Sequence, residues 1–154
     1  MEKRTRYEEM LRQLGGLMDG VDDQIARLAN AAALIHTTFG FWWTGFYLVK
    51  GDALILGPFQ GPVACTRIAR GRGVCGTSWD RGETIVVPDV EQFPGHIACS
   101  SESRSEIVVP MRDSSGSIIG VLDIDSAQLA TFDDVDREYL ERAVEIICCE
   151  LPTN

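Results

Sequence analysis

The hydrophobic pattern of this sequence changes twice, and the changes divide the chain into a helical, a β-type and again a helical part. Up to about residue 40, apolar side chains recur at steps of three and four residues, which is the period of an amphipathic helix. From Trp42 to Asp125 they fall instead into short β-branched and aromatic runs separated by glycine and proline. The helical period returns after Thr131. This order predicts an α+β fold, in which long helices pack on one face of a mainly antiparallel sheet of about six strands.

Three long helices are expected, two before the β-type part and one after it. The first covers residues 3–17, and the second covers residues 22–38 with Gly40 as its stop. Thr131 is the expected N-cap of the last helix, at residues 132–150. Their apolar stripes would cover one side of the sheet.

Turn residues divide the β-type part into strands and one short helix. The expected strands are residues 42–50, 53–57, 63–68, 83–88, 106–112 and 117–123. Residues 57–63 contain two prolines, so this stretch should be irregular or lie at a sheet edge. The glycines of residues 71–82 predict a tight turn into a short helix at residues 74–80, with Cys75 near its N-terminus. The Gly-Arg-Gly at residues 71–73 can also form a nest of backbone N–H groups that binds a carboxylate.

The charge balance argues against one class of partner. The 154 residues include 14 Lys and Arg against 23 Asp and Glu, a formal net charge of −9 at pH 7. Nucleic-acid binding depends on clustered basic side chains, so neither a nucleic acid nor an anionic membrane is an expected partner. No apolar run approaches the ~18 residues of a membrane span, and the charged first residues do not resemble a signal peptide. We therefore expect residues 1–154 to form a single cytoplasmic domain.

Five cysteines carry most of the chemical interest of the sequence. Cytoplasmic thiols are kept reduced, so a structural disulfide framework is not expected. Cys148 and Cys149 follow two isoleucines in the last helix and are interpreted as packing residues. Cys65, Cys75 and Cys99 instead lie beside glycine, proline or polar residues within one span of 35 residues. Three thiols placed in this way favour redox chemistry.

These three thiols are compatible with a catalytic cycle or with a metal site. A thiolate forms near neutral pH when a cation or a helix N-terminus lowers the thiol pKa from about 8.5. Cations near the three cysteines in the sequence are His96, Arg104, Arg67, Arg70 and Arg72. Two cysteines that can approach each other would pass through a sulfenic acid to a disulfide, which an external dithiol reduces.

The alternative is a structural zinc site made of Cys65, Cys75, His96 and Cys99, because these ligand types suit tetrahedral zinc. Nine residues separate the first two cysteines and 23 separate the next two, whereas zinc sites usually present close ligand pairs. We therefore expect neither a metal nor another cofactor.

Acidic and aromatic residues are candidates for a ligand pocket. Asp123 and Asp125 alternate with apolar residues in a strand, so both carboxylates should project from one face. In a closed pocket such a pair can bind an ammonium group or keep one carboxyl protonated, whereas at a solvated strand end it only caps the next turn. Glu106 opens an apolar strand, where a carboxylate is more often paired or functional than idle. Trp42 and Trp43 are adjacent, so one can face the core while the other walls a ligand site.

Three blocks of the sequence resemble the free methionine-(R)-sulfoxide reductases, single-domain enzymes of the GAF fold. The blocks are GPVACTRIARGRGVCGTSW, VPDVEQFPGHIACSSESRSEIVVP and GVLDIDS, and with WWTGFY and the last helix the resemblance covers residues 41–150. It implies a six-stranded antiparallel sheet flanked by helices, a homodimer, and reduction of free L-methionine-(R)-S-oxide with electrons from thioredoxin. A non-catalytic GAF sensor module that binds a cyclic nucleotide or another small molecule is the alternative that the fold allows.

The same resemblance implies roles for single residues. Cys99 in GHIAC would be the nucleophile, Cys65 in GPVAC the resolving partner and Cys75 in GVCG an accessory thiol. Trp43 in WTGFY would hold the methyl group of the substrate. Three acids would contact the sulfoxide oxygen and the ammonium group, namely Glu106, Asp123 and Asp125.

Overall fold

The computed structural model describes residues 1–96 and 102–149. Its strands are β1 (Trp43–Lys50), β2 (Ala53–Gln60), β3 (Arg67–Ala69), β4 (Ile85–Val87), β5 (Ser105–Arg112) and β6 (Ile118–Ser126). Its helices are α1 (Lys3–Met18), α2 (Gln24–Phe39), α3 (Gly73–Arg81), the 3-10 turn η1 (Val90–Gln92) and α4 (Asp134–Cys148). Within these residues, no helix has the length and apolar character needed to cross a membrane.

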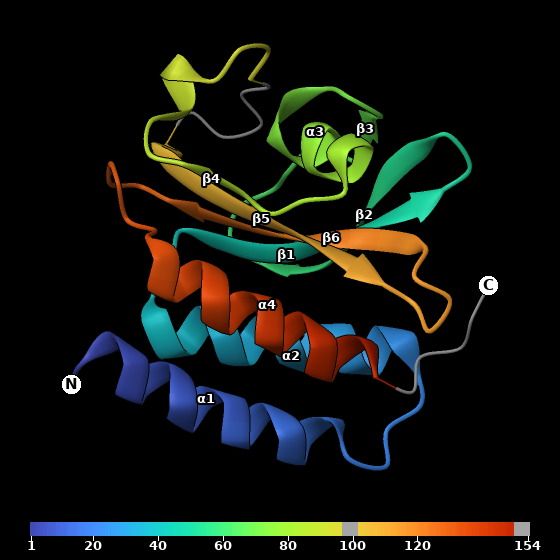
Figure 1. Ribbon diagram of the computed structural model, residues 1–154, viewed down its shortest axis with the longest axis vertical. Helices are drawn as coiled ribbons and strands as arrows, with labels where there is room; N and C mark the ends of the chain where they lie inside the picture. The colour runs from blue at the N-terminus through green and yellow to red at the C-terminus, as the bar shows by residue number, and fades with distance from the viewer. Residues whose placement is uncertain (97–101, 150–154) are drawn as a thin grey trace.

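These elements form layers around one sheet (Figure 1). The strand order is β3-β2-β1-β6-β5-β4, and every neighbouring pair is antiparallel. The long helices α2 and α4 lie side by side under one face, with α1 beneath them, whereas α3 and the segment that follows β4 lie over the other face (Figure 1). The α+β fold with a six-stranded antiparallel sheet that the sequence predicts is thus confirmed.

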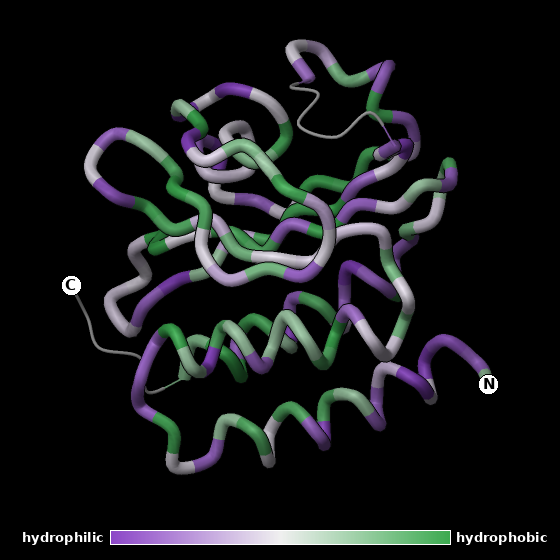
Figure 2. Tube along the Cα trace, turned by 180° about the vertical axis from the view of Figure 1, so that it is seen from behind, coloured by the Kyte–Doolittle hydropathy of each residue, from purple (hydrophilic) through white to green (hydrophobic). Residues whose placement is uncertain are grey.

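The two faces of the sheet bury different residues because side chains alternate along each strand. Phe46 and Leu122 point toward the long helices and join an apolar core with residues of α1, α2 and α4. Tyr47 and Val121, their neighbours in sequence, belong to a second cluster with Trp79 of α3. Figure 2 shows the same division: α2 is mostly hydrophobic in colour, while the start of α1 is hydrophilic. The side of the long helices is therefore a closed core, and the opposite side is where polar groups gather.

Two strand boundaries differ from those expected and change where candidate residues lie. β1 begins at Trp43, so Trp42 precedes the strand and the two tryptophans do not alternate within it. β3 is only three residues long, so Cys65 lies in the connection before it and not on a strand. β2 continues to Gln60 through Pro58, and this proline is tolerated because β3 pairs only with residues 53–55 of β2.

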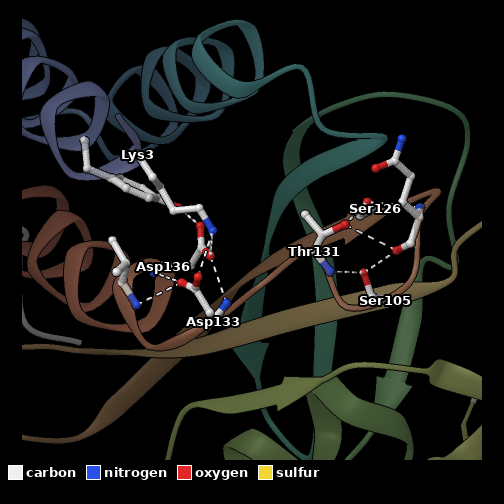
Figure 3. A network of polar contacts seen from close by, with 9 residues as sticks. Lys3, Ser105, Ser126, Thr131, Asp133 and Asp136 are labelled. Atoms are coloured by element: carbon white, nitrogen blue, oxygen red, sulfur yellow. Dashed lines mark hydrogen bonds and ion pairs between the residues drawn. The ribbon is translucent and has the colours of Figure 1, made fainter. Parts of the chain in front are cut away.

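The N-cap of α4 is Asp133, and the prediction of Thr131 is wrong. The Asp133 carboxylate accepts hydrogen bonds from the N–H groups of Val135 and Asp136, and Asp136 completes a capping box. Thr131 instead shares a hydrogen bond of 2.6 Å with the hydroxyl of Ser126 and donates its N–H to Ser105 (Figure 3). Thr131 therefore secures the connection between β6 and α4. An aspartate caps more strongly here because its carboxylate also lies 3.2 Å from the ammonium of Lys3.

Arg27 is a buried cation that joins three helices. Its side chain is 2% exposed, and it lies on α2 facing the ends of α1 and α4. The guanidinium donates to five backbone carbonyls, which belong to Met18, Val21, Ile146, Ile147 and Cys149. These carbonyls lie in or just after the last turns of α1 and α4, where a helix leaves its C=O groups without intrahelical partners. Arg27 therefore caps two helix C-termini with one side chain.

Candidate functional site

A pocket lies on the face of the sheet opposite the long helices. It is lined by β1, β5, β6, the start of α3 and the two segments that precede β3 and β5. Its cavity has a volume of about 50 Å³, which suits the polar end of a small ligand and excludes a folded macromolecule. The candidate residues that line it are Trp43, Cys75, Glu106, Asp123 and Asp125.

Strand register explains why these residues meet. Asp125 of β6 is the cross-strand partner of Glu106 on one side and of Trp43 on the other. Asp123, two residues earlier, projects from the same face, as the alternation predicts. Both aspartates lie inside β6, so the alternative of a solvated strand end is wrong for this pair. Antiparallel pairing thus brings three carboxyls and an indole together, although more than 60 residues separate the indole from the nearest of the acids.

The indole of Trp43 forms an apolar wall next to the acids. Its ring is stacked with Phe59 and Tyr47 at centroid distances of 5.2 Å and 5.9 Å. It also lies over Gly45, where an added Cβ would stand only 2.6 Å from the ring atom Cη2. The absence of a side chain at Gly45 is therefore what allows the indole to lie across the strand. Gly45 and Tyr47 are not among the site residues predicted from the sequence, although the alternation of WTGFY places both on the face of Trp43.

The connection that carries Cys65 is tied to this wall. The indole Nε1 of Trp43 donates to the carbonyl of Pro62 at 3.0 Å, and the hydroxyl of Tyr47 donates to the carbonyl of Cys65 at 2.8 Å. Val63, in the same connection, lines the pocket. Cys65 takes part in a disulfide bond. Cys99, the predicted nucleophile, lies outside the described residues.

The three carboxyls differ in how their surroundings affect ionisation. Burial raises the pKa of Glu106 well above its ordinary value, and the nearby charges of Asp123 and Asp125 raise it further. Burial and the charge of Asp123 raise the pKa of Asp125 well above its ordinary value too. Burial also raises the pKa of Asp123, but hydrogen bonds from Glu106 and Cys75 oppose this effect. Among the three, Asp123 is therefore the group best suited to carry the negative charge.

Cys75 is placed near a helix N-terminus, as predicted, but it is not an activated thiol. Its side chain is 4% exposed at the first turn of α3. Burial raises the pKa of Cys75 well above its ordinary value, and the charges of Asp123 and Glu106 add to this. Two of the expected cations are engaged elsewhere, because Arg67 pairs with Asp52 and Arg70 pairs with Asp80. Desolvation therefore outweighs the helix N-terminus at Cys75.

His96 also lines the pocket, next to Glu106. Its Nε2 lies 3.9 Å from Oε1 of Glu106, and burial lowers its pKa from the ordinary value of 6.5. The imidazole is therefore neutral at neutral pH.

The predicted nest at residues 71–73 does not form, because the N–H of Gly71 is bonded to Gly76 and that of Arg72 to Ala69.

The zinc ligand set weighed as an alternative in the sequence includes Cys99, which lies outside the described residues. Cys65 is disulfide-bonded, and the cluster of possible ligands is Cys75, Glu106 and Asp123. In the pocket the thiol of Cys75 thus lies beside the carboxyls of Glu106 and Asp123, and Cys65 does not belong to this cluster.

Comparison with known proteins decides the family. The model of the GAF domain matches residues 23–151. This chain belongs to the GAF-domain family. Within that family, the chain is 54% identical over 146 residues to "GAF domain-containing protein A" of Dictyostelium discoideum, covering 94% of this chain and 92% of that protein. It is 46% identical to the free methionine-R-sulfoxide reductase of Escherichia coli, with 94% of this chain and 87% of that protein covered.

A solved GAF-domain structure is similar over nearly the whole chain. The free methionine-R-sulfoxide reductase of Neisseria meningitidis, in complex with its substrate, matches with a TM-score of 0.93 and 52% sequence identity. The match covers 96% of this chain and 89% of the other. The family resemblance noted in the sequence is thereby confirmed.

Proposed function

We propose that this protein reduces free L-methionine-(R)-S-oxide to L-methionine. The observation that carries the proposal is the pocket itself, in which three carboxyls and the Trp43 indole converge on one face of the sheet. A free amino acid carries an ammonium group that a carboxylate can bind, and its methyl sulfoxide end needs an apolar wall and an acid. The relatives from Escherichia coli and Neisseria meningitidis are both named free methionine-R-sulfoxide reductase, and the second was solved in complex with its substrate.

In the proposed reaction the Cys99 thiolate attacks the sulfur of the sulfoxide. The sulfoxide oxygen takes up a proton and moves to the cysteine sulfur, so that methionine leaves and Cys99 becomes a sulfenic acid. Cys65 then attacks this sulfur and releases water as the disulfide forms. A dithiol protein of the thioredoxin type reduces the disulfide and is itself oxidised. The hydrogen bond from Tyr47 to the carbonyl of Cys65 would hold the resolving residue beside the pocket.

The acids divide the remaining work in this proposal. Glu106 stays protonated because of its raised pKa, so it can give a proton to the sulfoxide oxygen. Asp123 carries the negative charge that pairs with the substrate ammonium. Groups with separated pKa values are the usual basis for assigning acid and charge-pairing roles in one site. A peptide-bound methionine sulfoxide has no ammonium group at this position, so the pocket would reject it.

The same acids disfavour the alternative of a cyclic-nucleotide sensor. A cyclic nucleotide carries a phosphate, which a pocket with Glu106, Asp123 and Asp125 repels. Arg72 is the one cationic side chain among the described lining residues other than His96. A sensor of a cationic small molecule would still fit, and it would bind without thiol-dependent turnover.

Three further properties belong to this proposal: the thioredoxin-type reductant, a homodimer and a cytoplasmic location. Light scattering of the purified protein tests the dimer, and turnover with thioredoxin, its reductase and NADPH tests the reductant. Fractionation of the source cells tests the location.

The deciding experiment is turnover of four substrates by the reduced protein: the free R epimer, the free S epimer, and the N-acetyl derivative of each. Turnover is expected with the free R epimer alone. Cys99→Ser should abolish it, while Cys148→Ser, on the far face, should retain it. Full activity of Cys99→Ser would remove that residue from the nucleophile role, and equal turnover of the N-acetyl R epimer would contradict the ammonium contact.

A further inference from the structure

The pocket contains a buried thiol, Cys75, to which the proposed reductase reaction gives no role, beside two of the acids that the reaction uses. The sulfur of Cys75 and one carboxylate oxygen each of Glu106 and Asp123 all lie within 4.8 Å of one another. All three residues are buried and line the same cavity. Binding of an ammonium group needs only carboxylates. The buried thiol adds a soft ligand, which an ammonium cannot use but a transition metal can.

A second observation points to a ligand at the same place. Oδ1 of Asp123 is buried and accepts no hydrogen bond from any described residue. A buried carboxylate oxygen without a hydrogen-bond partner destabilises the fold, because the desolvation of the atom is not compensated. The atom is therefore free to take a ligand, and Asp123 lines the cavity in which such a ligand would lie.

His96 supplies a fourth ligand of suitable chemistry. Its Nε2 lies 3.9 Å from Oε1 of Glu106, and its imidazole lines the cavity. Thiolate, imidazole and carboxylate are the ligands that zinc takes, in a tetrahedron with bonds of about 2.0–2.3 Å. Ligand atoms in such a tetrahedron are about 3.3–3.8 Å apart. A contraction of about 1 Å from the observed spacing would therefore bring Cys75, Glu106 and Asp123 onto one ion, and the imidazole of His96, which lies outside that cluster, would have to turn toward it to become the fourth ligand.

We propose that Cys75, Glu106, Asp123 and His96 bind one zinc ion, and that this ion inhibits the protein by occupying the substrate pocket. The ion displaces the thiol proton of Cys75 and the carboxyl proton of Glu106 to solvent as the metal–sulfur and metal–oxygen bonds form, and no electron is transferred. Zinc is favoured over magnesium and calcium because these harder cations prefer an all-oxygen set. The inhibitory part rests on the proposed function, because the ion would compete with the substrate ammonium for Asp123. The binding part does not.

Binding is tested on the metal-free, fully reduced protein without substrate. Zinc is titrated against a chromophoric chelator, and cobalt replaces zinc for absorption spectroscopy, in which a thiolate ligand gives a charge-transfer band. We expect one ion per chain, displacement of cobalt by zinc, and no competition from magnesium. Cys75→Ser should abolish the charge-transfer band, and Asp123→Asn should weaken zinc binding by at least about tenfold while the band remains. Cys148→Ser is the matched control and should bind as the parent does.

Two outcomes would overturn the site. One is the absence of stoichiometric zinc binding to the reduced parent. The other is a charge-transfer band that survives in Cys75→Ser but is lost in Cys65→Ser or Cys99→Ser, because the ion would then sit on the thiols of the proposed redox pair. Circular dichroism shows whether each variant is folded, and Asp123→Asn tests the site separately from the thiol.

Inhibition is measured in a second arm as the rate of sulfoxide reduction at rising zinc and substrate concentrations. Competitive inhibition that is weakened in Cys75→Ser supports the proposal. Zinc binding to a protein without any sulfoxide turnover would contradict the proposed function and leave the metal site intact. Turnover that is insensitive to saturating zinc would contradict the inhibitory part alone.

Discussion

Replacement of Arg27 by methionine should destabilise the fold strongly, because one side chain satisfies carbonyls from two helix ends. The carbonyls of Met18 and Ile147 are bonded to the guanidinium in buried surroundings, at 2.8 Å and at 3.0–3.1 Å. In the variant the carbonyl of Ile147 loses its guanidinium donor, at a cost of about 1–3 kcal/mol. The carbonyl of Met18 keeps a hydrogen bond from the N–H of Val21 at 3.2 Å and loses only its bond to the charged group, worth about 1.5–3 kcal/mol, so the two losses together come to about 2.5–6 kcal/mol. The other three carbonyls are partly exposed and can bond to water.

Two effects of the substitution act in the opposite direction. Methionine fills much of the space of the arginine stem, and the variant no longer desolvates a cation. We therefore expect a loss of about 2–4 kcal/mol in the free energy of unfolding. For a chain of this size, that corresponds to a fall of roughly 5–15 °C in the melting temperature.

Urea unfolding followed by circular dichroism measures the difference at a fixed protein and reductant concentration. Arg137→Met is the matched control, because Arg137 is 46% exposed on α4 and pairs with Glu141 only at 3.9 Å. That control should lose about 0.5 kcal/mol or less. A loss below about 1 kcal/mol in Arg27→Met would refute the argument that the guanidinium is the main cap of α1 and α4.

Three further predictions follow from single contacts. In Glu106→Gln, the free energy of unfolding should fall less steeply than in the parent as pH rises from about 4.5. The raised pKa of Glu106 means that the folded parent binds more protons than the unfolded chain above that pH, which costs about 1.4 kcal/mol per pH unit until the folded-state pKa is passed. Urea unfolding free energies of parent and variant that run parallel across this pH range would contradict the prediction. Gly45→Ala should displace the Trp43 indole, cost about 1–3 kcal/mol and raise KM for the sulfoxide, whereas unchanged tryptophan fluorescence and KM would show that the ring can move freely. Asp133→Ala should lower the free energy of unfolding by about 1 kcal/mol and speed amide exchange in the first turn of α4. Thr131→Val should leave amide exchange in that turn unchanged.

The sequence predicts the architecture well because the fold depends on patterns of many residues. The shift between periods of about 3.6 and 2 marks the helices and the sheet, and no single residue decides it. Boundaries depend on individual competitors and are less predictable. Thr131 and Asp133 are both good cap residues, and Thr131 is instead held by Ser126 and by Ser105, which lies 26 residues earlier in the sequence. The β3 boundary similarly depends on a distant partner, because β3 pairs only with residues 53–55 of β2.

The candidate site is predictable in composition but not in electrostatics. Alternation alone places Asp123 and Asp125 on one face, and the family resemblance adds Trp43 and Glu106. The neighbours of a residue in the sequence, however, do not show how far the fold shields its side chain from water. Cys75 looks activated in the sequence because it begins a helix among arginines, yet in the fold it is enclosed beside carboxyls and its pKa rises. The role of Arg27 is not predicted from the sequence, because a charged residue in an amphipathic helix is expected to face solvent.

The division of the sheet into a closed and a polar face explains how this small fold sustains such a site. Burying Glu106 and Asp123 without a cationic partner costs stability, and the raised pKa of Glu106 is the direct sign of that cost. The opposite face compensates with an apolar core in which residues from three helices and three strands are almost fully buried. Because side chains alternate along β6, Leu122 and Ile124 pack in the apolar core on one face while Asp123 and Asp125 are held in the pocket on the other face. A bound cation, whether the ammonium of a substrate or a metal ion, would therefore stabilise the protein by relieving this repulsion, and the increase in melting temperature should vanish in Asp123→Asn.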